Sequence, residues 1–433
     1  MSGAAEAPAG GPLADLRAAL DRATSLPLVA FVGALFLALL LGVVALHLRA
    51  LEPPSGGRID VGTGDFLAFW TGAVAVHEGH GAALYDFASQ RALQARILGG
   101  ASPDFQGYLN PPLLAVALSP AVRLGYLGGF FAFSGACALA LALAIAWMAR
   151  LVPTVRALRG GAWALVFLVA SWQPVLQTTL GGQYTPLTLA LLVGFALAMQ
   201  RRRTAWAALA LGLLSYKPQY AVGLGVAAVM AGQWRVAGGA ALVGAAHWAL
   251  GAAVCGPLWP RDMLAFMDTY RPLELAANAG THFSLVRTAG YLLPSPADGI
   301  VSAAGVALVL SLWWRFRRLG RDGDRLWSAL AVCGTMLASP HQQYYDVAIL
   351  VLPVAILVDE ALARDGGVPL GARVALALAY VGYPAWAWYA TLGVQPLFFV
   401  LAAVAWWVVR ACARADADGA QRWKREDAAQ ATA

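Results

Sequence analysis

A single carboxylate lies at the start of an apolar segment within the longest polar stretch of the chain, residues 49–110. Asp65 directly precedes the run from Phe66 to Trp70. Apolar side chains in residues 66–76 recur at helical spacing, which predicts an amphipathic helix lying in a membrane interface. From that position Asp65 could act as a general base that takes a proton from a hydroxyl group. The alternative is a helix N-cap, a role for which aspartate is equally suited.

Lys217 is the second residue whose type stands out. The chain has only two lysines, Lys217 and Lys424, among 30 basic residues, and Lys217 lies between two short apolar runs, 205–216 and 219–233. A lysine near the middle of a membrane costs roughly 2.5–3.5 kcal/mol, so it requires an anionic partner or access to water. A lipid phosphate or a structural carboxylate would be such a partner, and extension of the side chain to the interface is the third option.

A dense polar run, Ser339 to Asp346, follows another apolar segment. Pro340 is expected to end that helix and to leave His341 at the surface, where the imidazole could donate a hydrogen bond to a phosphate oxygen or position a base. The alternative is a loop histidine without a role. Gln183, in the turn 181–184, could bind sugar hydroxyls, and Tyr108, before the paired prolines of 111–112, could line a pocket or belong to the architecture.

The remaining motifs argue against several classes of chemistry. The other histidines are scattered, and neither HExxH nor DxD spacing is present, so we expect no metal site. Phosphate-binding glycine loops and the GxSxG elbow are absent as well, and no cofactor is predicted. No two of the four cysteines are close in the sequence, which indicates neither a disulfide framework nor a zinc site.

The elements that position these residues are predicted to be membrane helices. Hydrophobic residues make up 60% of the 433 residues and charged residues 12%, about half the charge of a soluble domain. The first run, 27–48, exceeds the core of about 7–15 residues in a signal peptide and is expected to be a retained anchor. With the pair around Lys217, we predict about twelve spans, and 111–122 as a short or re-entrant helix. The other runs are 127–148, 160–180, 183–200, 236–257, 300–314, 326–340, 344–358, 374–392 and 394–409.

Arginines set the predicted orientation. They cluster at 150–159, 201–203, 315–325 and 410–425, and the positive-inside rule places these groups in the cytoplasm. The net charge of +7 thus reflects topology, and nucleic-acid binding is not expected. We predict a cytoplasmic N-terminal segment (1–26), a transmembrane catalytic domain (27–411) with a first extracytoplasmic loop (49–110), and a disordered cytoplasmic tail (412–433). The polar residues described above would then face outward from a bacterial inner membrane.

Several short motifs, taken in order from about residue 60 to 350, resemble glycosyltransferase family 87, the polyprenyl-phosphate-mannose-dependent mannosyltransferases of the GT-C superfamily. The resemblance implies a GT-C-like all-α fold, with Asp65 as the catalytic base and His341 beside the donor phosphate. In one respect the sequence departs from the family, whose late loop often holds an Asn-Gln-Ser run, because here only Asn278 and Ser284 are present. The matching motifs are Asp65 with Phe69 and Trp70, Gly79, Leu84-Tyr85-Asp86, Phe105 and Tyr108 with Pro111-Pro112, Gly182-Gln183, Lys217-Pro218-Gln219, and Pro340-His341 with Tyr345-Asp346.

By this resemblance the chain is expected to transfer a hexose from a polyprenyl-phosphate sugar to a hydroxyl of a lipid or envelope glycan. The expected hexose is mannose. The resemblance also implies an inverting reaction, and no metal would be needed because side chains alone can neutralise a lipid monophosphate leaving group. Asp65 and His341 would be catalytic, and Lys217, Gln183, Tyr108, Gln219 and Tyr345 would bind substrate. A secondary transporter and a non-catalytic scaffold of an envelope-assembly complex are the alternatives. A transporter would have broken helices at matching positions of two halves, and no such pairing is found in the sequence.

Overall fold

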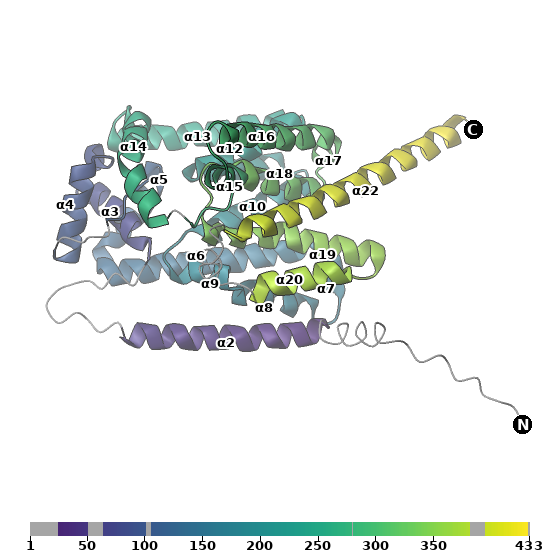
Figure 1. The fold of residues 1–433 in the computed structure, drawn as a ribbon, viewed down its shortest axis with the longest axis horizontal. Coiled ribbons are helices and arrows are strands. Elements are labelled where there is room, and N and C mark those ends of the chain that lie inside the picture. Colours follow the sequence, from purple (N-terminus) through teal and green to yellow (C-terminus); the bar gives the residue numbers. More distant parts are fainter. Residues whose placement is uncertain (1–24, 51–63, 101–104, 279, 382–394, 432–433) are drawn as a thin grey trace, which may run out of the picture.

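The computed structural model describes residues 25–50, 64–100, 105–278, 280–381 and 395–431. These residues form helices joined by turns, and the part described contains no named strand. Many of the helices run along the longest axis of the molecule (Figure 1). The chain is therefore an all-α protein, as predicted. Residues 1–24 of the predicted N-terminal segment, residues 51–63 of the first loop and most of the run 374–392 lie outside the described residues.

The first part of the chain carries Asp65. Its elements are α2 (Leu26–Ala50), α3 (Phe66–His77), η1 (Gly81–Ala83), α4 (Phe87–Leu98), α5 (Pro112–Leu118), η2 (Ser119–Leu124) and α6 (Gly125–Leu151). The middle part comprises α7 (Pro153–Ala157), α8 (Gly161–Ser171), α9 (Gln173–Leu180), α10 (Thr185–Gln200), α11 (Thr204–Leu213), η3 (Leu214–Tyr216), α12 (Pro218–Met230) and α13 (Trp234–Cys255). The last part comprises α14 (Trp259–Asn278), α15 (Leu285–Leu292), α16 (Ala297–Arg315), α17 (Arg317–Arg321), α18 (Arg325–Ala338), η4 (Tyr344–Leu350), α19 (Val351–Asp365), α20 (Leu370–Val381) and α22 (Leu397–Ala431).

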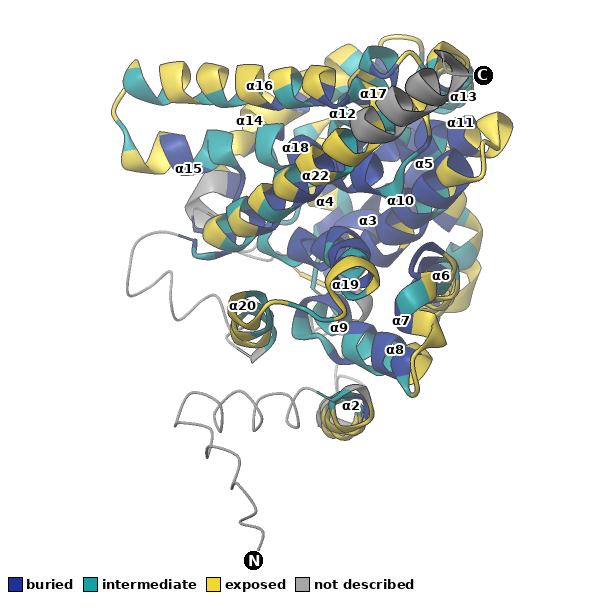
Figure 2. Ribbon diagram, turned by 90° about the vertical axis from the view of Figure 1, so that its right-hand side faces the viewer, coloured by how far each residue is buried: buried dark blue, intermediate teal, exposed yellow. Residues whose placement is uncertain are grey.

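Four helical segments of the described chain are long and apolar enough to cross a membrane. They are Pro112–Leu151, Trp234–Cys255, Ala297–Arg315 and Leu397–Gly419, and eight shorter apolar helices of 10–17 residues accompany them. Large apolar side chains such as Phe31, Leu139, Leu242 and Leu308 are exposed on α2, α6, α13 and α16. Figure 2 shows exposed residues on the outer helices α2 and α16. Such surfaces suit lipid contact, and the protein is a membrane protein, whereas the count of twelve spans stays a prediction.

Three segments differ from the expectation. The run 160–180 is two helices, α8 and α9, because the chain becomes extended at Trp172 and α9 begins at Gln173, with Pro174 in its first turn. The tail 412–433 was expected to be disordered, but α22 continues through it to Ala431. The helix beginning after Asp65 forms as predicted, yet residues Phe66–Ala75 of α3 are all buried. It is therefore an internal helix and lacks the exposed polar face of an interfacial one.

The arginine groups meet at one end of the molecule. Arg202 donates to the carbonyl of Asp322 (3.3 Å), and Arg325 donates to the carbonyl of Leu151 (2.6 Å). Arg315 pairs with Asp416 on α22 at 2.8 Å. All four groups are thereby joined, as the positive-inside rule requires of loops on one side of a membrane. A cavity of about 240 Å³ at this end is lined by Arg315, Arg317, Arg318 and Asp416.

The candidate site residues lie at the other end of the same helices. Helix α10 begins at Thr185, two residues after Gln183, and ends at Gln200, next to the arginine run. Helix α18 likewise runs from Arg325 to Ala338, just before His341. At 1.5 Å per residue these helices separate the two ends by roughly 20–25 Å. The bundle therefore divides the charged residues into an arginine end and a site end.

Candidate active site

Asp65 is held against the turn that contains Gln183. Gly64 has a left-handed backbone (φ 59°), and a Cβ there would lie 2.5 Å from the carbonyl oxygen of Gly181, so the close approach of the two loops requires glycine. The Asp65 carboxylate accepts a hydrogen bond from the Gln183 amide. It makes no capping bond to α3, so the N-cap interpretation does not describe its side chain.

The environment of Asp65 suits a base. Burial raises the pKa of Asp65 to about 6, and the hydrogen bond from Gln183 opposes that rise. A carboxylate with a pKa near the working pH is a stronger base than an exposed aspartate and is still ionised in sufficient fraction. The rigid position comes from α3, whose Phe66 packs against Phe130 and Phe133 on α6, with ring centroids 5.3 and 5.4 Å apart.

Lys217 forms a buried ion pair with a residue that the sequence did not single out as a site residue. Its ammonium lies 2.6 Å from the Asp346 carboxylate, and the side chains are only 5% and 2% exposed. Thr185 donates to the same carboxylate oxygen at 2.9 Å. The structural carboxylate, one of the partners considered for Lys217, is thus present in the protein. Local sequence explains the placement, because Lys217 precedes Pro218 and so takes a non-helical conformation between η3 and α12.

Aromatic rings line this ion pair. The Lys217 ammonium lies 4.9 Å from the centroid of the Tyr184 ring and 5.7 Å from that of Tyr220. The Tyr220 hydroxyl is hydrogen-bonded to the Gln342 amide. Tyr345 directly precedes Asp346 in η4, and its ring centroid lies 5.3 Å from that of Tyr344.

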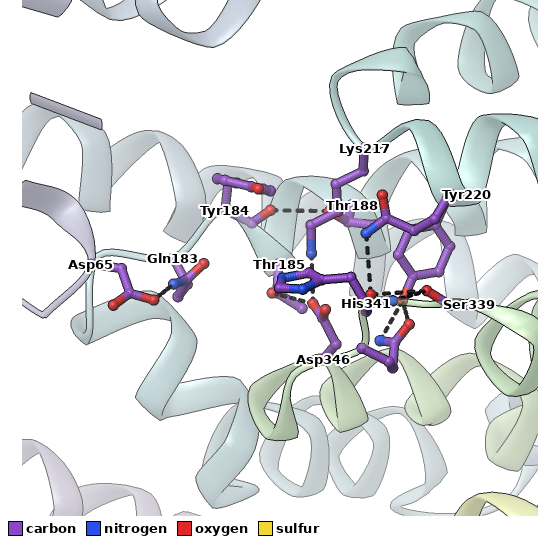
Figure 3. Close-up of polar contacts among 12 residues, drawn as sticks. Asp65, Gln183, Tyr184, Thr185, Thr188, Lys217, Tyr220, Ser339, His341 and Asp346 are labelled. Carbon is purple, nitrogen blue, oxygen red and sulfur yellow. Dashed lines mark hydrogen bonds and ion pairs between the residues drawn. The ribbon is translucent and has the colours of Figure 1, made fainter. Parts of the chain in front are cut away.

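Three consecutive residues connect the two halves of the site. Gln183 binds Asp65, Tyr184 faces Lys217, and Thr185 binds Asp346. Figure 3 shows the Asp65–Gln183 pair on one side of this segment and the Lys217–Asp346 pair with His341 on the other. The fold therefore brings a carboxylate, an ammonium group and a histidine from distant parts of the sequence to one end of the bundle.

His341 belongs to a second polar group, which also contains Glu274 and His282. The Nδ1 atom of His341 lies 3.3 Å from Nε2 of His282 and 3.9 Å from Oε1 of Glu274, and the His282–Glu274 distance is 3.3 Å. Burial, followed by the neighbouring His282, lowers the pKa of His341, which favours the neutral imidazole. Burial raises the pKa of Glu274, but the hydrogen bond with His282, helped by the charge of Arg287, outweighs burial and lowers the pKa overall.

The remaining predicted residues divide into two cases. The Gln219 amide reaches the backbone carbonyl of His341 at 3.5 Å, so Gln219 belongs to the site. Tyr108 is fully buried, and its hydroxyl donates to Pro111 and accepts from the Ala115 amide. Tyr108 thus has the architectural role that was its alternative, with no hydroxyl capacity left for a substrate.

The residues that sequence reasoning missed are Asp346, Thr185, Glu274 and His282. Asp346 was visible within the run after Pro340, and the need of Lys217 for an anion was the signal that could have selected it. No such signal marked Glu274, which lies in α14, or His282, which looked like one of several scattered histidines.

The geometry defines a membrane protein with a polar site at one end of an all-α bundle. Residues 108–340, more than half of the chain, match glycosyltransferase family 87. The chain belongs to this family, and it is a membrane glycosyltransferase. The matched region includes Gln183 and Lys217 and ends directly before His341, while Asp65 precedes it. No curated protein and no solved structure matches the chain.

Proposed function

We propose that the protein transfers a hexose, specifically mannose, from a polyprenyl-phosphate donor to a hydroxyl of a lipid or envelope glycan acceptor. The observation that carries the proposal is the segment Gln183–Thr185, which holds Asp65 on one side and the Lys217–Asp346 pair on the other. A base for the acceptor and a cation for the leaving group are what a single transfer step requires. The arginine end would lie in the cytoplasm, so the site end would face outward from the bacterial inner membrane.

In the proposed step, Asp65 takes the proton of the acceptor hydroxyl as its oxygen attacks the anomeric carbon. The bond from that carbon to the donor phosphate breaks, and the polyprenyl phosphate leaves with the electron pair. One displacement inverts the anomeric centre. Lys217 and His341 stabilise the charge on the departing phosphate, while Gln183, Gln219 and Tyr345 contact the sugar and phosphate.

Lys217 is suited to this role because its ammonium group can still donate further hydrogen bonds. An ammonium has three donors, and among the described residues Asp346 is its one hydrogen-bond acceptor. Asp346 holds Lys217 in place before the polyprenyl-phosphate sugar binds, which lowers the entropic cost of positioning the lysine.

The two other functions are less well supported. A scaffold would leave Asp65 and Lys217 without converging groups, whereas both contact neighbouring residues of one segment. A buried lysine–aspartate pair would also suit ion coupling in a transporter, but membership of a glycosyltransferase family favours transfer. Sugar transfer to an acceptor, measured with the purified protein, distinguishes a glycosyltransferase from a transporter.

The Asp65→Asn variant tests the proposal most directly. Asparagine keeps the shape and removes the base, so we expect turnover with a polyprenyl-phosphate sugar to fall by about 10²–10⁴-fold while donor binding is retained. Asp86→Asn is the matched control, because Asp86 caps α4 in the same loop through the amide of Ser89 and asparagine caps equally well. An Asp65→Asn enzyme that turns over near the wild-type rate would refute the assignment.

A further inference from the structure

Three potential metal ligands converge beside the proposed donor site. They are Oε1 of Glu274, Nε2 of His282 and Nδ1 of His341, and all three lie within 4.8 Å of one another. They come from α14, from the turn before α15 and from the segment between α18 and η4. Two imidazoles with one carboxylate form a ligand set typical of zinc and related divalent ions.

The separations between these atoms fit a common ion. Zinc binds nitrogen and oxygen at about 2.0–2.2 Å with tetrahedral geometry, which places neighbouring ligand atoms about 3.3–3.5 Å apart. The measured separations are 3.3, 3.3 and 3.9 Å. An ion could therefore bind with shifts of a few tenths of an ångström.

The ligands are held in place before any ion binds. His282 forms a strand-like bridge with Gln343, and the amide of Phe283 donates to the carbonyl of Gln342 at 3.1 Å. The side-chain amide of Gln343 lies 3.3 Å from Oε1 of Glu274 and 3.3 Å from Nε2 of His282, and a bound ion would replace these two contacts. The side chain of His282 is 0% exposed and that of Glu274 is 10% exposed, whereas His341 is 43% exposed. The group is thus buried on one side and open at His341.

Charge in this region also favours a cation. Asp65, Asp346 and Glu274 contribute three carboxylates, against the ammonium of Lys217 and the guanidinium of Arg287, which donates to the carbonyl of Pro340 at 2.7 Å. With Asp65 ionised, the group carries a net negative charge before an anionic donor binds. A divalent ion would reverse that sign where the phosphate must bind.

We propose that Glu274, His282 and His341 bind one divalent cation of the zinc class, with a further coordination position open to a phosphate oxygen. The second part rests on the proposed function, and the ion site itself does not. Binding through Nδ1 leaves the proton of His341 on Nε2, on the opposite side of the ring from the ion, so His341 would act on the phosphate through the ion. Such an ion site departs from the expectation, drawn from the absence of metal-binding motifs, that the chain holds no metal.

Metal binding to the purified full-length protein in detergent provides the test. After chelator treatment, calorimetry with Zn²⁺ is expected to show one equivalent bound, whereas Mg²⁺, which prefers oxygen ligands, should bind far more weakly. Glu274→Gln and His282→Gln should each weaken Zn²⁺ binding by about 100-fold or more, since even residues behind the ligands contribute about 10–100-fold. His247→Gln, at a half-buried histidine that contacts Ser215, is the matched control and should bind as the wild type does.

Cobalt supplies a second readout, because the visible absorption of Co²⁺ reports its ligands. Farnesyl phosphate added to the Co²⁺ form should change the spectrum, and an unchanged spectrum would exclude the phosphate as a ligand. Zn²⁺ binding that is absent, or unchanged in both variants, would overturn the site while leaving the Asp65 result untouched. Conversely, Zn²⁺ bound as expected by a protein that transfers no sugar would overturn the proposed function alone.

Discussion

Two buried ion pairs lie at opposite ends of this bundle, and they differ in how completely they are satisfied. At the arginine end, Arg325 contacts Asp359, Glu360 and the carbonyl of Leu151, and Asp359 also accepts from the amide of Val155 at 2.7 Å. At the site end, the Lys217 ammonium contacts Asp346 and two aromatic rings. Among the described residues the first pair makes four hydrogen bonds with the protein, whereas the Lys217 ammonium has one hydrogen-bond acceptor.

The difference indicates which pair serves stability and which serves binding. A rigid, forked guanidinium that joins α18, α19 and the end of α6 fixes the arrangement of helices. A lysine held by one carboxylate can exchange part of its bonding with an incoming anion. Burial and charge are similar in the two pairs and do not distinguish their roles. The number of hydrogen bonds that each cation makes with the protein does distinguish them.

The largest expected effect tests the stabilising pair. Arg325→Ala leaves Asp359 buried without its cation, and we expect the free energy of unfolding to fall by about 3–5 kcal/mol. Unfolding in mixed micelles measures it. Arg414→Ala is the control, because Arg414 forms a half-exposed pair with Asp365 at 3.5 Å, and its loss should change stability by at most about 1 kcal/mol. Equal losses in the two variants would remove the distinction between a buried clamp and a surface pair.

Matched double variants sharpen the comparison. Arg325→Met with Asp359→Asn, and Lys217→Met with Asp346→Asn, remove both charges while asparagine still accepts from Val155 or Thr185. Replacing both partners of a buried pair is often close to neutral for stability. We therefore expect both proteins to fold, and the Lys217 double variant alone to lose donor affinity, by about 30-fold or more. Retained donor binding would make the Lys217 pair structural.

The single Lys217 variants refine this result. Lys217→Ala should weaken donor binding strongly, whereas Lys217→Arg should retain part of it, because arginine keeps the charge in a different geometry. Titration with a polyprenyl-phosphate sugar measures both.

The smallest expected effect concerns pH. Because burial raises the pKa of Asp65 to about 6, turnover should fall as the pH drops through about 6 and the base becomes protonated. Gln183→Leu removes a hydrogen bond that lowers this pKa, so the same limb of the profile should move upward by about one pH unit. Initial rates across the pH range measure it, with Gln233→Leu at the arginine end as the control. If the acid limb of the pH profile does not move in Gln183→Leu, the group that titrates in this limb is not Asp65.

The sequence by itself determined the class and the distribution of charge. Long apolar runs can be satisfied only as helices, because a membrane supplies no partners for backbone groups, and helix locations followed from those runs. Arginine groups indicated one end, and the ordered motifs indicated the family that residues 108–340 then confirmed. The isolated Lys217 between apolar runs predicted an anionic partner, because a buried charge without a partner costs too much free energy.

Only the tertiary structure decided which groups meet. The lysine's partner, Asp346, lies 129 residues away, and Gln183 reaches Asp65 across 118 residues. The spacing of apolar residues in α3 also could not predict that the helix is internal, because neighbouring helices bury both of its faces. Glu274, His282 and His341 match no ligand spacing for the same reason. Their proximity depends on how separate helices pack, and helix packing is a property of surfaces far apart in the chain.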